Sequence, residues 1–193
     1  MSDIMISEIL HRSVEVKNKM ISVCAGPAEQ AAQMIANSMQ KGGKLMLCGN
    51  GGSAGDSQHL AAEFVATLDH AKPRPSLPAL SLTTDTSFLT AYANDFGFED
   101  VFARQVEALG QPGDVLLGIS TSGNSKNVLA AAKAAKDNQI SVIAFTGETG
   151  GQMADFADLL VAIPSRIIMH IQECHIALGH AITARVETLL SEK

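Results

Sequence analysis

A short apolar run that ends in a glycine-rich turn and then becomes helical constrains the fold of this chain most strongly. Residues 44–48 (Lys-Leu-Met-Leu-Cys) lead into residues 49–53 (Gly-Asn-Gly-Gly-Ser) and a helical pattern that reaches Phe64. This order is typical of a strand that turns sharply into a helix. Glycines let the backbone approach a ligand closely, and the free N–H groups of the first helical turn can bind an anion. The turn therefore predicts a site for a phosphate or a sugar oxygen, although such glycines can also serve the turn alone.

Two side chains on the predicted helix could supply chemistry beside this turn. His59 and Glu63 are four residues apart, so both project from one face of the helix. They offer a base or a pair of metal ligands. The simpler alternative is a solvated ion pair that stabilises the helix by about 0.2–0.5 kcal/mol.

Composition narrows the class of protein. The chain has 193 residues, of which 46% are apolar and 18% charged, and this suits one globular domain with a full core. A net charge of −6 argues against a non-specific nucleic-acid binder. The cysteines (Cys24, Cys48 and Cys174) are odd in number and widely spaced, so we expect no disulfide framework, no thiolate zinc site and a reducing cytoplasm. Neither a signal-peptide core nor a run of membrane-spanning length is present, so no membrane association is expected.

The first 41 residues are predicted to form two helices. Apolar residues recur at helical spacing from Ile4 to about Cys24, Gly26-Pro27 is expected to break that helix, and a second helix is expected from Ala28 to Gln40. Both helices precede the first strand of a minimal α/β unit. We expect this segment to pack on the sheet or on a neighbouring subunit.

The rest of the chain alternates strands and helices. After a proline-rich connection at 69–78, strands are predicted at 79–82, 115–119, 140–145 and 159–163, and helices at 87–92, 101–109, 127–136, 153–157 and 171–190. This alternation predicts an α/β fold, a doubly wound and mainly parallel sheet flanked by helices. Ligands of such sheets bind beyond the carboxyl ends of the strands, where the glycine turns should open together.

A second polar turn follows the predicted strand at 115–119. Four hydroxyl side chains lie within six residues, beside a glycine: Ser120, Thr121, Ser122 and Ser125. Hydroxyls and helix-start N–H groups can surround a phosphate without a fixed positive charge. The alternative is that these serines cap the helix and fill the turn.

Polar residues interrupt an apolar face of the last helix. They are Gln172, Glu173, His175 and His180. Buried polar groups need partners, so the cluster predicts a ligand, a metal or a hydrogen-bond network. Gln172 and His180 are eight residues apart, about 12 Å along the axis, and must lean together to share one ion. His175 is an alternative ligand.

Several motifs follow one another from about Gly42 to the C-terminus: C-G-N-G-G-S with H-x-x-x-E, N-D-F-G-F, G-D-V-L-L-G-I-S-T-S-G-N-S, T-G-x-x-G-G and I-Q-E-x-H-x-x-x-x-H. In this order they resemble the phosphoheptose isomerases, a family of sugar isomerase (SIS) domain enzymes. The resemblance implies a single SIS domain over residues 1–193 with a flavodoxin-like or Rossmann-like sheet. It also implies a homotetramer whose sites form between subunits.

The activity implied by the resemblance is isomerisation of sedoheptulose 7-phosphate to D-glycero-D-manno-heptose 7-phosphate for surface polysaccharide, which includes lipopolysaccharide. Glu63 and His180 would be the acid/base pair, and one zinc per subunit would be held by His59, Glu63, Gln172 and His180. The implied substrate contacts are Asn50, Gly51, Gly52, Glu63, Asn94, Asp95, Ser120, Thr121, Ser122, Ser125 and Gln172. Enediol chemistry needs groups that move protons between two carbons and two oxygens, which a carboxylate and an imidazole provide. Whether the zinc is catalytic or structural stays open.

Two segments depart from the family pattern. Ala66-Thr67-Leu68 stands where an arginine is usual, and Ile168-Met169-His170 stands where an Asp or Thr and an Arg are usual. Arg74, His70, His170 or a neighbouring subunit would have to compensate. An isomerase for another sugar phosphate is therefore an alternative, and so is a non-catalytic SIS tetramer that binds a protein partner, as in the DnaA initiator-associating type.

Overall fold

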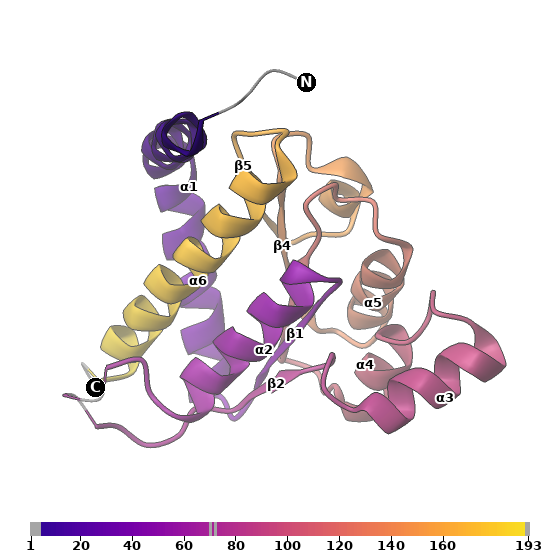
Figure 1. Ribbon diagram of the computed structural model, residues 1–193. Helices are drawn as coiled ribbons and strands as arrows, with labels where there is room; N and C mark the ends of the chain where they lie inside the picture. The colour runs from indigo at the N-terminus through magenta and orange to yellow at the C-terminus, as the bar shows by residue number, and fades with distance from the viewer. Residues whose placement is uncertain (1–4, 70, 72, 192–193) are drawn as a thin grey trace.

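The computed structural model describes residues 5–69, 71 and 73–191, which form a parallel sheet with helices on both faces (Figure 1). The five strands lie in the order β2-β1-β3-β4-β5, and every neighbouring pair is parallel. Their bounds are β1 Leu45–Gly49, β2 Ala79–Ser81, β3 Val115–Ile119, β4 Ser141–Gly147 and β5 Leu159–Ile163. The predicted doubly wound parallel sheet is confirmed.

The helices divide between the two faces of this sheet. Their bounds are α1 Ile6–Gln40, α2 Gly52–Val65, α3 Thr86–Phe96, α4 Ala103–Leu109, α5 Lys126–Asp137 and α6 Ile168–Ser191, with a 3₁₀ helix η1 at Gly151–Asp155. The apolar side chains of α1, α2 and α6 share one core cluster, and those of α4, α5 and η1 share the other. Strands β1 and β3 are buried along their whole length, as strands covered on both faces must be.

The register of the two central strands places both polar turns at one edge of the sheet. Gly49 at the end of β1 pairs with Ile119 at the end of β3. A Cβ at Gly49 would lie 2.9 Å from the carbonyl oxygen of Ile119, so only glycine fits at this point. The chain therefore leaves β1 and β3 side by side.

The prediction of two N-terminal helices is wrong, because α1 continues without a break through Pro27. Pro27 lacks the N–H that would bond to the carbonyl of Val23, which costs the helix one hydrogen bond. Val23 lies on the exposed side of the helix, where water can satisfy its carbonyl, while Cys24 and Ala28 are buried and hold the helix against the sheet. Figure 1 shows the first turns of α1 nearly end-on and its later turns running beside α6.

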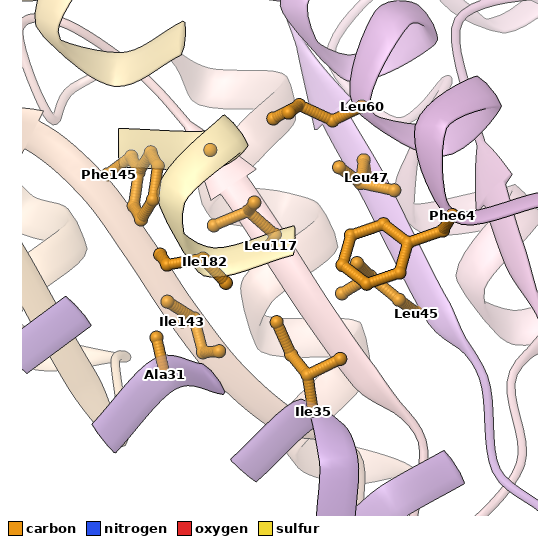
Figure 2. Close-up of a pocket in the computed structure, with 11 residues that line it drawn as sticks. Ala31, Ile35, Leu45, Leu47, Leu60, Phe64, Leu117, Ile143, Phe145 and Ile182 are labelled. Atoms are coloured by element: carbon orange, nitrogen blue, oxygen red, sulfur yellow. The ribbon is translucent and has the colours of Figure 1, made fainter. Parts of the chain in front are cut away.

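The core is continuous between the sheet and the helices α1, α2 and α6. A gap of about 10 Å³ lies there, and its lining is apolar. Figure 2 shows side chains of this lining, such as Ile35, Leu47, Phe64 and Phe145. A gap of this size without polar lining is part of the core and no ligand site. Within the described residues, helix length and hydropathy together rule out a membrane-spanning helix.

Candidate active site

A close approach of α2 and α6 builds the centre of the site. A Cβ at Gly179 would lie 2.5 Å from a methyl group of Leu60, so a larger residue would push the helices apart. Gly179 directly precedes His180, and Leu60 directly follows His59. The glycine therefore lets two histidines, 121 residues apart in the sequence, face one another.

Three potential metal ligands gather at this contact. One atom from each of His59, Glu63 and His180 lies within 4.8 Å of the other two. Nε2 of His59 is 3.3 Å from Oε1 of Glu63 and 2.8 Å from Nε2 of His180. Two ligands of a tetrahedral zinc are about 3.3 Å apart, since each bond is about 2.0 Å long. Two imidazoles and a carboxylate are donors that zinc accepts, so the residues present fit this ion.

Gln172 lies against the first turn of α2, beside the glycine turn that precedes this helix. A Cβ at Gly52 would stand 3.3 Å from Cγ of Gln172, and Nε2 of Gln172 donates to Oδ1 of Asp56 at 2.7 Å. Asp56 is buried, and burial raises the pKa of its carboxyl group, while Gln172, His59 and His180 act in the opposite direction. The sequence prediction did not include Asp56. Its position one turn before His59 was the signal that could have found it.

The first glycine turn is tied to the second by an amide pair. Nδ2 of Asn50 donates to Oδ1 of Asn127, and Nδ2 of Asn127 donates to Oδ1 of Asn50, both at 2.8 Å. Gly51 has φ +56°, which favours glycine, and it directly precedes the first turn of α2. The Asn50 side chain therefore links the glycine turn to the start of α5.

The serine turn is compact and packs against the loop after β4. Oγ of Ser120 and Oγ of Ser125 lie 2.9 Å apart, and Oγ of Ser122 accepts from the backbone N–H of Asn124. Gly123 lies so close to Gly150 that a Cβ on Gly123 would overlap the carbonyl oxygen of Gly150. A hollow of about 330 Å³ opens beside this turn, lined by Thr121, Ser122, Gly147, Glu148, Thr149, Ser165, Arg166, Ile168 and Ile171.

Asn94 and Asp95 lie near the end of α3, on the outside of the molecule. Both are solvent-accessible, and Nδ2 of Asn94 donates to Oδ1 of Asp95 at 2.8 Å. None of the residues of α3 is buried. The structure therefore does not bring these two side chains into contact with the group formed by His59, Glu63 and His180.

The polar side chains predicted to cluster on the last helix point to three different places: α2, α1 and the core. His175 points into the core, where its ring packs on Phe145 and Nε2 lies 3.1 Å from the carbonyl oxygen of Thr146. Burial lowers the pKa of His175 to about 4. Glu173 faces α1 and bonds to His170, whose side chain is buried. The expectation that His175 is an alternative ligand is wrong, because a helix turns by 100° per residue and places it on the far side from His180.

The side chains expected to replace the usual arginines have other partners. Arg74 donates to the carbonyl oxygens of Glu63 and Phe64 and to Oε1 of Glu187, so it holds the end of α2. His70 lies outside the described residues. The arginine beside the hollow is Arg166, which pairs with Glu148 and which the sequence prediction did not single out.

Comparisons with known proteins agree with this architecture. Residues 10–147 match the family model described as the SIS domain. The chain is 48% identical to the phosphoheptose isomerase of Aquifex aeolicus, covering 97% of each chain, and 48% identical to that of Roseiflexus sp., covering 95% of this chain and 92% of the relative. The structure of phosphoheptose isomerase from Neisseria gonorrhoeae superposes with a TM-score of 0.89 at 43% identity, covering 95% of this chain and 97% of the other.

Proposed function

The chain belongs to the phosphoheptose isomerase family of SIS-domain enzymes, and we propose that it interconverts sedoheptulose 7-phosphate and D-glycero-D-manno-heptose 7-phosphate. The observation that carries the proposal is the meeting of Glu63 and His180, where Glu63 lies on the helix that begins at the glycine turn. The product would enter heptose synthesis for surface polysaccharide. Free, buried cysteines support a reducing cytoplasm as the compartment.

Glu63 and His180 are the groups to which we assign the proton transfers. Conversion of a ketose into an aldose first removes a proton from C1 and protonates the C2 oxygen. The hydroxyl on C1 then loses its proton, and C2 gains one. No atom is gained or lost overall. A carboxylate that lies within 4.8 Å of an imidazole can divide these transfers between two groups. The side chain of Glu63 is only 19% exposed, which limits exchange of the transferred proton with solvent.

The serine turn is the part that we assign to the phosphate. Ser120, Thr121, Ser122 and Ser125 offer hydroxyl donors beside the N-terminal end of α5, where N–H groups are unsatisfied by the helix. The neighbouring hollow of about 330 Å³ provides space next to two of these hydroxyls. Asn50, Gly51 and Gly52 complete the proposed substrate contacts from the first turn, together with Gln172.

We assign one zinc ion per subunit to His59, Glu63 and His180, with Gln172 as a further ligand. When bound, the ion supplies stabilisation of negative charge on the substrate oxygens. The protein's own contribution is to orient its ligands: α2 presents His59 and Glu63 from one face, and α6 presents His180 across from them.

A homotetramer with sites between subunits fits the exposed surfaces. Apolar side chains stay exposed along α1, including Ile6, Leu10, Val14 and Ile21, and α3 has no buried residue. An assembly would bury these faces. It would also allow Asn94 and Asp95 of one subunit to reach the substrate of another, which explains their distance from the metal group in a single chain.

The test is a comparison of Glu63→Gln and His180→Gln with Glu107→Gln, an exposed control on α4. Each of the first two should lower kcat for sedoheptulose 7-phosphate by at least about 100-fold while circular dichroism stays unchanged, because each removes one proton-transfer group. The control should keep full turnover. Near-normal turnover by Glu63→Gln or His180→Gln in a folded protein would refute the assignment. The same assay on other ketose phosphates tests the alternative substrates.

A further inference from the structure

Asp56 is a buried carboxylate in the wall of the proposed metal site. It lies on α2, one turn before His59, and is only 6% exposed. Oδ1 accepts a hydrogen bond from Nε2 of Gln172 at 2.7 Å. Oδ2 is also buried, and among the described residues it has no hydrogen-bond partner. Burying a carboxylate with one oxygen that lacks a hydrogen bond lowers the free energy of unfolding. Asp56 therefore destabilises the fold at this position.

The hydrogen bond between these two side chains fixes which way the amide of Gln172 points. Oδ1 of Asp56 accepts the hydrogen bond that Nε2 of Gln172 donates, so the NH₂ group of Gln172 faces Asp56. The amide oxygen then points away from Asp56 and is free to act as a ligand. Packing against Gly52 also restricts the side chain of Gln172. A Cβ at position 52 would lie only 3.3 Å from Cγ of Gln172.

The same carboxylate also lies three residues before another proposed ligand, His59, on α2, so both side chains project from one side of the helix. Asp56 therefore touches one proposed ligand, Gln172, directly and is a helical neighbour of a second. Oriented partners of this kind behind metal ligands commonly change metal affinity by about 10- to 100-fold.

We propose that Asp56 is a positioning residue that turns the amide oxygen of Gln172 toward His59, Glu63 and His180. This inference rests on the proposed zinc site. The proposed role of Asp56 is to orient the amide of Gln172 and not only to supply a negative charge. It must therefore matter which of the two side chains donates the hydrogen bond and which accepts it. Exchanging donor and acceptor between positions 56 and 172 should then preserve the arrangement.

The experiment is a double-mutant cycle in zinc affinity, measured by competition with a chromophoric chelator on the metal-free full-length protein. Asp56→Asn alone should weaken zinc binding by about 10- to 100-fold, since the new amide no longer demands the NH₂ group of Gln172. In the Gln172→Glu background, Asp56→Asn should not weaken binding. The amide at position 56 can then donate to the carboxylate at position 172, whose second oxygen stays available for the ion.

The controls separate orientation from charge and from folding. Asp137→Asn, an exposed neutralisation at the end of α5, should leave zinc affinity unchanged. Thermal unfolding of each metal-free variant should show that it is folded. If the asparagine variant is insoluble, the zinc affinity of Asp56→Ala is compared with that of the wild type instead.

Three results would overturn the inference. Equal loss of zinc affinity on Asp56→Asn in both backgrounds would show that Asp56 acts through its charge. Wild-type affinity in both Asp56→Asn and Asp56→Ala would show that it has no role at the site, while the zinc proposal itself would stand. A wild-type protein that binds no zinc would refute the zinc site first, and this inference with it.

Discussion

Nε2 of His59 and Nε2 of His180 face one another at 2.8 Å, with their ring planes at 85°. At this distance the N–H of one ring donates a hydrogen bond to the ring nitrogen of the other. A divalent cation between them would be bound by both lone pairs instead, so proton and metal compete for the same position. The pair explains why α2 and α6 must pack so closely at Gly179.

Loss of one imidazole from this pair should release the metal. We expect His59→Ala to weaken zinc binding by more than about 100-fold. Loss of a residue that only supports a metal ligand costs up to about 100-fold in affinity, and loss of a ligand itself should cost more. Chelator competition measures the change, and His11→Ala on the exposed side of α1 is the matched control. Zinc affinity equal to that of the wild type would place the metal elsewhere.

Arg74 should stabilise the end of α2. Its side chain is 9% exposed, and it binds Glu187 as well as the last carbonyl groups of the helix. Arg74→Ala should lower the free energy of unfolding by about 3 kcal/mol, because the largely buried carboxylate of Glu187 loses its cationic partner and keeps, among the described residues, only the N–H of Leu68. Urea denaturation measures this loss. Arg104→Ala removes an exposed pair with Glu107 and should cost less than about 1 kcal/mol.

His175 should make the fold sensitive to mild acid. Burial lowers its pKa from 6.5 to about 4, so the folded protein resists its protonation and the unfolded chain does not. Stability from this residue is complete above pH 6.5 and is lost as the pH falls to about 4, by about 3 kcal/mol in total. Unfolding free energies at pH 7 and pH 4.5 should differ less in His175→Gln than in the wild type. An identical pH dependence would contradict the prediction.

We expect the aromatic side chains of α3 to be part of an interface in the proposed tetramer. Phe88 stacks on Tyr92 with ring centres 5.3 Å apart, Tyr92 lies 4.9 Å from Phe96, and Phe96 is 73% exposed. Phe96→Asp should produce smaller assemblies, since a charge in an apolar interface is costly to bury. Light scattering coupled to size exclusion measures the mass. Asp100→Asn, an exposed change nearby, should keep the wild-type mass.

The amide bridge between the two turns should matter for substrate binding. Asn127→Ala removes both hydrogen bonds with Asn50 and leaves the side-chain amide of Asn50 without this partner. We therefore expect the free energy of unfolding to fall by about 1–3 kcal/mol. KM for the sugar phosphate should rise while kcat changes less, because the proton-transfer groups are untouched. Gln58→Ala, which removes exposed hydrogen bonds to Thr83, is the control. An unchanged KM would show that the turns hold their positions without the bridge.

Much of the fold could be read from local patterns. Apolar runs bounded by glycine turns formed strands at the predicted places, because strands covered on both faces must be apolar throughout. The prediction failed at Pro27, where local propensity favours a break. Burial of the flanking residues Cys24 and Ala28 outweighs the lost hydrogen bond there, and that burial depends on contacts with distant parts of the chain.

Local patterns in the chain were sufficient to predict the parallel sheet, the two polar turns at one edge and the spacing of His59 and Glu63 on one helical face. These features follow from periodicity and chain direction. Long-range packing was needed to show that His180 and not His175 completes the group, that Arg74 serves α2, and that Asp56 bonds to Gln172. The angle and distance at which two helices pack depend on residues such as Gly179 and Leu60, whose contact no local pattern reveals.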